Sequence, residues 1–121
     1  MVPVKDFALV ALGGALGCVA RFAVSTYMPR LEFPWHTLLV NLAGSFVLGF
    51  LFLDHGMEHN TRLLVAVGFL GGFTTLSTFS VETIDLAKTG RQGLALANLL
   101  ANGLGGPLVA FAGWRLAVVF T

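Results

Sequence analysis

The sequence predicts an all-α integral membrane protein, a single domain over residues 1–121 with four transmembrane helices. Hydrophobic residues make up 56% of the chain and charged residues 11%, whereas a soluble domain carries about 25% charged residues. Four apolar stretches each approach or exceed the length of about 20 residues that a helix needs to cross the hydrocarbon core. A net charge of +1 offers no basic surface for nucleic acid. The composition therefore excludes a soluble enzyme, a disordered chain and a nucleic-acid-binding protein.

The predicted spans are residues 7–28, 35–53, 61–87 and 93–120. The connecting stretches are short and polar, so none of them holds a soluble domain, and any function lies within the bilayer. The single cysteine, Cys18, excludes an intramolecular disulfide and a cysteine-rich metal site.

Glycines in the first and third spans recur at the spacing of close helix contacts. Gly13 and Gly17 form one such pair, and Gly68 and Gly72 form another. These pairs indicate a contact either within one subunit or between two. Because four short helices enclose little interior, we expect self-association on grounds of size.

Polar residues in the second and fourth spans each line one helical face. The residues concerned are Thr37, Asn41, Ser45 and Gly49 in the second span, and Asn98, Asn102 and Gly105 or Gly106 in the fourth. An unpartnered amide in lipid costs several kcal/mol. A single membrane asparagine more often joins helices than binds a ligand. Polar faces that converge from several helices favour a lined pathway.

The third span predicts a broken helix near the middle of the bilayer. Gly71-Gly72 precedes a run from Thr74 to Ser80 in which five of seven residues carry hydroxyl groups. Hydroxyl side chains can bond backbone groups that a break releases, and broken helices at this depth recur at ion sites. The alternative is a continuous helix whose hydroxyl groups bond carbonyls one turn back.

The distribution of Lys and Arg gives no clear orientation in the membrane. One side would hold Lys5, Arg62 and Arg115, and the other Arg30, Lys88, Arg91 and Arg21. Such a balance reflects either the small number of charges or a chain that inserts in both orientations. In the second case, two opposed copies could pair about a two-fold axis in the membrane plane.

The polar groups of the spans suit a small anion. No acidic residue lies in the middle of a span, although a proton-coupled cation exporter needs a membrane carboxylate. Amide N–H groups and hydroxyls dominate, with Arg21 as the cation of the first span. The 11 Phe residues add electropositive ring edges. The pattern His55-Gly56-Met57-Glu58-His59 formally matches a zinc-peptidase motif, but a glycine interrupts it and no third ligand accompanies it.

The chain resembles the small microbial fluoride channels, the Fluc or CrcB family, over essentially its whole length. Three stretches carry this resemblance: residues 13–22, 37–46 and 68–82. The third is the most specific, because it combines the double glycine with the run of hydroxyl residues.

The resemblance implies an antiparallel, dual-topology homodimer in the cell membrane with a pair of separate fluoride pores. It further implies a structural sodium ion on the dimer axis, held by backbone carbonyls of Gly71 and Thr74 from both subunits. No organic cofactor and no enzymatic activity are expected. The partners implied are the fluoride ion, a second copy of the chain and the lipid bilayer.

The resemblance also assigns residues to the pathway and to its ends. The implied fluoride pathway comprises Asn41, Leu76, Ser77, Thr78, Phe79, Ser80 and Asn98, and the implied pore entrance comprises Arg21 and Glu82. Three positions depart from the family pattern. Leu76 replaces a phenylalanine, His36 replaces a glycine, and Gly106 stands where a serine or threonine is usual.

The sequence therefore predicts a channel that exports fluoride passively and lowers its toxicity. A small dual-topology exporter of toxic cations and a structural membrane subunit without transport activity are the alternatives.

Overall fold

The computed structural model describes residues 1–52 and 56–120, and every secondary-structure element in that part of the chain is helical. The elements are α1 (Val4–Tyr27), α2 (Trp35–Phe52), α3 (His59–Thr61), η1 (Arg62–Leu70, a π-helix), α4 (Gly71–Phe73), α5 (Leu76–Lys88), α6 (Gln92–Gly103) and α7 (Gly105–Phe120).

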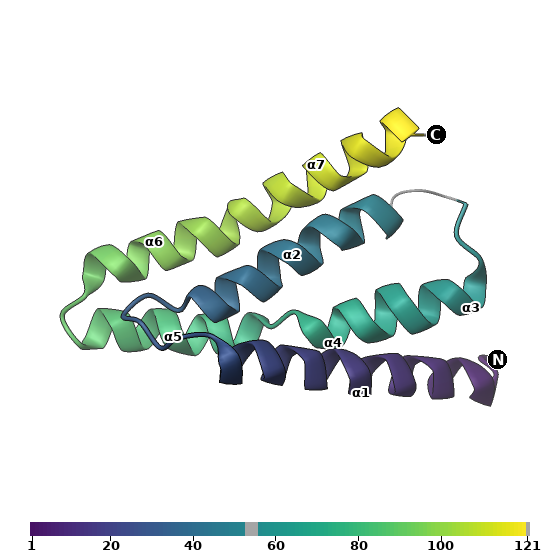
Figure 1. The fold of residues 1–121 in the computed structure, drawn as a ribbon, viewed down its shortest axis with the longest axis horizontal. Coiled ribbons are helices and arrows are strands. Elements are labelled where there is room, and N and C mark those ends of the chain that lie inside the picture. The colour runs from purple at the N-terminus through teal and green to yellow at the C-terminus, as the bar shows by residue number, and fades with distance from the viewer. Residues whose placement is uncertain (53–55, 121) are drawn as a thin grey trace.

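The chain runs along its long axis in four alternating passes, and both ends of the described chain lie at the same end of the bundle (Figure 1). Three passes are long and apolar enough to cross a membrane, namely Val4–Tyr27, His59–Lys88 and Gln92–Phe120, and Trp35–Leu51 is a shorter apolar helix. Each pass overlaps one predicted span. Leu53, the last residue of the second predicted span, lies outside the described residues.

Large apolar side chains cover the outside of the bundle, whereas its centre holds few of them. Phe7, Phe22 and Leu108 are each about two-thirds exposed, at 67%, 70% and 67%. Half of the buried apolar residues are small, as Val40 and Ala66 illustrate. An apolar exterior of this extent is typical of a surface that faces lipid or another protein.

Glycines bring the helices of one chain into close contact. A methyl group at Gly13 would overlap the carbonyl oxygen of Leu64, and one at Gly17 would overlap that of Phe69. The glycine pattern of the first span therefore packs α1 against η1 within the subunit, which is one of the two expected alternatives.

The contact between α2 and α7 uses the same device. A methyl group at Gly49 would overlap the carbonyl oxygen of Ala110, and one at Gly113 would overlap that of Phe46. This contact could not be predicted from the sequence, because Gly49 and Gly113 lie in different spans and neither belongs to a repeated glycine pair.

Two passes are interrupted near their centres. In the third pass, Thr74 (φ −89°, ψ 157°) and Thr75 (φ −149°, ψ 117°) are extended between α4 and α5. In the fourth pass, helical structure is interrupted at Leu104, between α6 and α7. Pro107, three residues after Leu104, has no N–H to donate to the carbonyl of Gly103, which explains the second interruption.

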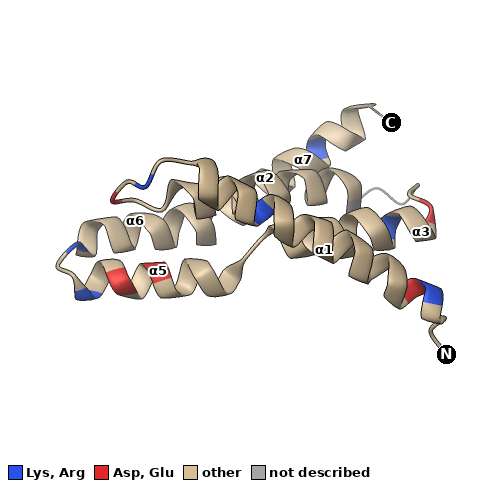
Figure 2. Ribbon diagram, turned by 60° about the horizontal axis from the view of Figure 1, so that its bottom comes forward, with Lys and Arg blue, Asp and Glu red and all other residues tan. Residues whose placement is uncertain are grey.

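Charged residues gather at the two ends of the bundle (Figure 2). Arg21 departs from this pattern, because its Nε donates to the carbonyl of Gly72 at 3.1 Å, beside the interruption of the third pass.

Candidate functional site

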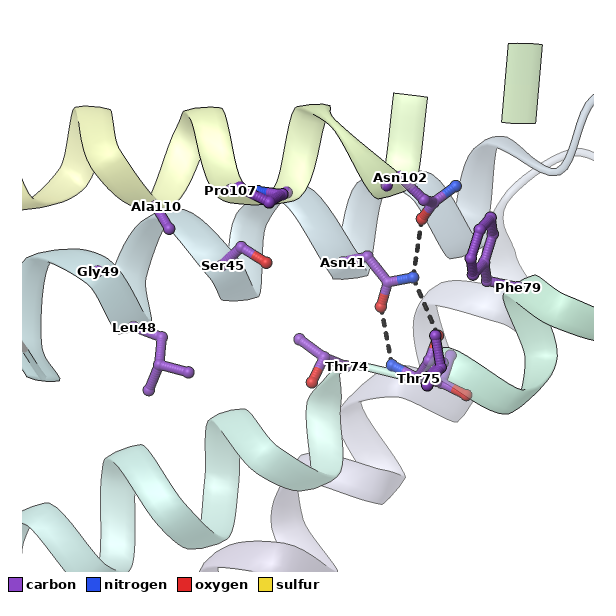
Figure 3. Close-up of a pocket in the computed structure, with 13 residues that line it drawn as sticks. Asn41, Ser45, Leu48, Gly49, Thr74, Thr75, Phe79, Asn102, Pro107 and Ala110 are labelled. Carbon is purple, nitrogen blue, oxygen red and sulfur yellow. Dashed lines mark hydrogen bonds between the residues drawn. The ribbon is translucent and has the colours of Figure 1, made fainter. Parts of the chain in front are cut away.

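The side chain of Asn41 on α2 holds the extended segment between α4 and α5 (Figure 3). Its Oδ1 accepts a hydrogen bond from the N–H of Thr75 at 2.8 Å, and its Nδ2 donates to the carbonyl of Thr75 at 3.0 Å. The amide therefore bonds both backbone groups of one residue, as a neighbouring strand would. This pairing satisfies polar groups that the interruption of the helix releases.

The hydrogen bonds continue from Asn41 into α6 and then into α5. Nδ2 of Asn41 also donates to Oδ1 of Asn102 at 2.9 Å. Asn102 donates to Oδ1 and to the carbonyl of Asn98, at 2.9 and 3.1 Å. Asn98 in turn donates to Oγ1 of Thr83 at 2.9 Å. We call Asn41, Asn98, Asn102, Thr75 and Thr83 the amide network; it ties α2, α5 and α6 together.

Most amide N–H donors of this network already form hydrogen bonds within the protein. An asparagine amide has two N–H donors, and both donors of Asn41 and of Asn102 are accounted for by the bonds above. Asn98 is completely buried, at 0% exposure. The network therefore positions the surrounding helices, and an ion beside it must meet other groups or compete with these bonds.

An open cavity of about 510 Å³ lies beside the amide network, between α2, α5 and the α6–α7 interruption (Figure 3). Polar groups from Asn41, Ser45 and Thr74 line it, and none of its lining residues is charged. The Leu76 side chain at its edge is 75% exposed, whereas the Phe79 side chain is buried.

A second cavity, of about 180 Å³, lies on the other side of Thr75 and contains hydroxyl groups and a cation. Its lining includes Arg21, Ser25, His36, Thr37 and Thr78. Thr37 is 1% exposed, and its Oγ1 has no hydrogen-bond partner among the described residues. A buried hydroxyl without a partner is costly, which makes it a candidate donor to an ion or a water molecule.

The carbonyl oxygens that the interruption releases include those of Gly71 and Thr74. In a continuous helix, Gly71 O would accept from the N–H of Thr75, but that N–H donates to Asn41. Thr74 O would likewise accept from the N–H of Thr78, which instead donates to the hydroxyl of Thr75 at 3.2 Å. Carbonyl oxygens without N–H partners are suitable ligands for a hard cation.

Comparison with known proteins identifies the family. The family model described as CrcB-like protein, Camphor Resistance (CrcB), matches residues 8–114. The chain belongs to the CrcB family.

Members of the CrcB family in several bacteria are similar to this chain over most of their length. A protein of Magnetococcus marinus is 47% identical over 116 residues, which cover 89% of this chain and 94% of that protein. A protein of Dehalococcoides mccartyi is 46% identical, with 89% and 88% covered. One of Thermus thermophilus is 43% identical, with 93% and 94% covered. All three are named "Fluoride-specific ion channel FluC".

The structure distributes the expected CrcB pathway residues over several environments. Asn41, Leu76 and Phe79 line the larger cavity, whereas Thr78 lines the smaller one. Asn98 lines neither of these cavities and lies inside the amide network.

The remaining hydroxyl groups of α5 and the expected entrance residues lie apart from Asn41. Ser77 and Ser80 line a third open space beside Arg21 and Gly71, and the hydroxyl of Ser80 donates to Leu76 O at 2.8 Å. An oxygen of the Glu82 carboxylate, Oε2, lies 3.2 Å from Nε2 of His36. The expected set thus flanks the break on more than one side.

Three members of the amide network, Thr75, Thr83 and Asn102, were absent from the expected site, although Thr75 lies within the run of hydroxyl residues. Asn102 lies on the polar face noted in the fourth span, so its spacing from Asn98 was the available signal. Thr83 gave no comparable signal, because it follows the run of hydroxyl residues and joins the network through the fold alone.

The residues of the zinc-peptidase pattern have other roles. The Glu58 carboxylate accepts from the N–H groups of Asn60 and Thr61 at 3.0 Å each, and these bonds hold its pKa below the usual value. His59 pairs with Asp6 at 3.1 Å. His55 lies outside the described residues.

Proposed function

We propose that this chain is a passive, fluoride-selective channel of the cell membrane, through which fluoride leaves the cytoplasm so that its toxicity falls. The observation that carries the proposal is the match to fluoride-specific channels over about nine-tenths of the chain, at 43–47% identity. Such a channel is not an enzyme and needs no organic cofactor.

The chemistry of the cavities supports an anion as the transported species. The larger cavity is lined by uncharged groups, and the smaller one combines hydroxyl groups with the guanidinium of Arg21. Neither lining contains a carboxylate. Neutral donors hold a small anion only moderately, which conduction requires. The Thr37 hydroxyl is available for this purpose, because it has no partner among the described residues.

Fluoride efflux from proteoliposomes tests the proposal. Vesicles loaded with fluoride and containing the purified protein should release it many times faster than empty vesicles once the membrane potential is dissipated. Efflux no faster than from empty vesicles would favour a structural subunit, a function with which the committed amide donors also agree. Proton-coupled uptake of a toxic cation would instead show a cation exporter.

We infer that the working unit is an antiparallel homodimer with a sodium ion between the subunits. The carbonyls of Gly71 and Thr74 lose their helical partners at the interruption, which supports their role as ligands. Two copies would supply four such oxygens, and a bound ion would add stability without taking part in conduction.

Thermal unfolding in detergent tests the sodium ion without reference to transport. The unfolding temperature of the wild-type protein should be higher in sodium chloride than in choline chloride at equal ionic strength. Equal temperatures in the two salts would count against a bound sodium ion. The fluoride function would be unaffected by that result.

A further inference from the structure

His36 lies between two cavities and, among the described residues, it alone lines both. On one side is the cavity of about 180 Å³, which contains Thr37 and Thr78 and borders Thr75 of the interrupted helix. On the other is an outer cavity of about 300 Å³, formed between the α1–α2 connection and α5. Any small ion that moved from the outer to the inner cavity would pass the imidazole ring.

The ring lies in polar contact with a carboxylate of α5. Nε2 of His36 lies 3.2 Å from Oε2 of Glu82, and both side chains are largely buried, at 12% and 22% exposure. Arg30 Nη1 lies 3.5 Å from the same ring nitrogen. The other oxygen of Glu82, Oε1, is buried and has no hydrogen-bond partner among the described residues. A proton on the ring would therefore stabilise a carboxylate that is otherwise poorly satisfied.

The charged groups around the ring come from every element that borders it. They are Arg21 on α1, Arg30 and Glu32 on the α1–α2 connection, Glu82 and Asp85 on α5, and Arg91 before α6. In the outer cavity, three carboxylates face two guanidinium groups. The cavity therefore carries a net charge of −1 when His36 is neutral and of zero when His36 is protonated. Figure 2 shows this mixture of charges at the end of the bundle opposite the termini.

We propose that His36 is a further residue of the fluoride pathway, where its protonation admits the anion from the outer to the inner cavity. This inference rests on the proposed fluoride function. With a neutral ring, the unbalanced carboxylate repels fluoride from the outer cavity. With a protonated ring, the repulsion is offset and the second ring N–H becomes a donor to the passing ion. Among the surrounding groups, histidine alone ordinarily changes charge between about pH 5 and pH 8.

The test is fluoride efflux from proteoliposomes at equal pH on both sides, with the efflux from protein-free vesicles subtracted at each pH. Wild-type efflux should rise roughly three- to tenfold between about pH 8 and pH 5.5. This rise is smaller than the rate increase that unscreened charges can produce, because salt screens the charges of the cavity. The rise should shrink at high ionic strength. Wild-type efflux that does not change with pH overturns the inference but leaves the fluoride function intact. Absence of efflux at every pH overturns the fluoride function itself.

Two substitutions separate the charge of His36 from its packing. His36→Gln keeps an N–H donor but cannot titrate. At every pH, its efflux should therefore equal that of the wild-type protein at about pH 8. Glu82→Gln removes the repelling carboxylate, so its efflux should remain high throughout. A wild-type pH slope in either variant would overturn the inference.

His59→Gln is the matched control. His59 also pairs with a carboxylate, but it is 63% exposed and lies at the opposite end of the bundle. This variant should keep the wild-type pH slope. Loss of the slope in His59→Gln would also overturn the assignment to His36.

Discussion

At the scale of single residues, Asn41 determines the conformation of the interrupted helix. Its amide bonds the N–H and the carbonyl of Thr75, so the extended backbone is paired on one side instead of exposed. The same amide reaches Asn102, so the interruption and α6 are held in one arrangement. This pairing uses the planar side-chain amide, which presents a donor and an acceptor on neighbouring atoms, as the side chains of Asn and Gln do.

Asn41→Asp should abolish or strongly slow fluoride efflux. The carboxylate still accepts from Thr75 but offers no donor to Thr75 O or to Asn102. The oxygen that replaces Nδ2 would face two other acceptors, which should cost roughly 2–3 kcal/mol of stability. The added negative charge would also repel the anion. Efflux and thermal unfolding measure the two effects. Asn60→Asp, outside the amide network, is the control, and normal efflux in Asn41→Asp would remove this residue from the pathway.

Leu76→Phe should raise fluoride throughput several-fold. Leu76 lines the larger cavity with a 75% exposed side chain, so a ring fits there without a clash. The ring would place an electropositive edge beside the pathway. Efflux from vesicles measures the change, and Leu96→Phe on the exposed face of α6 is the matched control. Equal rates in the two variants would indicate that the pore is lined by other groups.

At the scale of elements, close backbone contacts set the positions of the helices. Gly13 and Gly17 bring α1 against η1, and Gly49 and Gly113 bring α2 against α7. A side chain has no room at these contacts. Two helices can therefore approach this closely only where one of them presents a glycine. In a membrane, close packing of this kind replaces much of the hydrophobic drive between helices.

Gly113→Ala should destabilise the protein by roughly 1–3 kcal/mol, a typical cost of overpacking. The added methyl group would overlap the carbonyl oxygen of Phe46 on α2. Thermal unfolding in detergent measures the loss. Gly93→Ala is the matched control, because nothing lies within 4 Å of a methyl group at that helical position. If both variants unfolded at the wild-type temperature, the contact between α2 and α7 would be looser than described.

The sequence indicated elements better than it indicated their partners. Four apolar stretches and a double glycine before a hydroxyl run are local patterns, and helical passes and an extended Thr74–Thr75 segment lie where those patterns occur. The interruption at Leu104 was missed, although Pro107 contained the local signal. The amide network and the contact of Gly113 could not be inferred, because each depends on which residues of separate helices meet. The contact between His36 and Glu82 was missed for the same reason.

At the scale of the whole molecule, the cations are shared between the two ends of the bundle. Lys5 and Arg62 begin elements at the end that holds the termini, whereas Arg30, Lys88 and Arg91 lie at the other end (Figures 1 and 2). Neither end has the excess of Lys and Arg that directs a chain to one orientation. This balance supports insertion in both orientations, which an antiparallel dimer requires.

Labelling of a single cysteine from one side of the membrane tests the orientation. Gln92→Cys in a Cys18→Ser background places the thiol at an exposed position at the start of α6. A membrane-impermeant maleimide should label about half of the molecules in intact cells and all of them after lysis. Labelling of all or none in intact cells would show a single orientation and would rule out the antiparallel dimer.

The double attachment of Thr75 has a consequence for how the channel operates over time. Displacing Thr75 would break both of its hydrogen bonds to Asn41 at once, and buried backbone groups that are left without partners are costly. The kink is therefore a fixed joint and not a hinge. Ions can pass a fixed joint without any rearrangement of the backbone around it, so the current at a given pH should vary only shallowly with temperature.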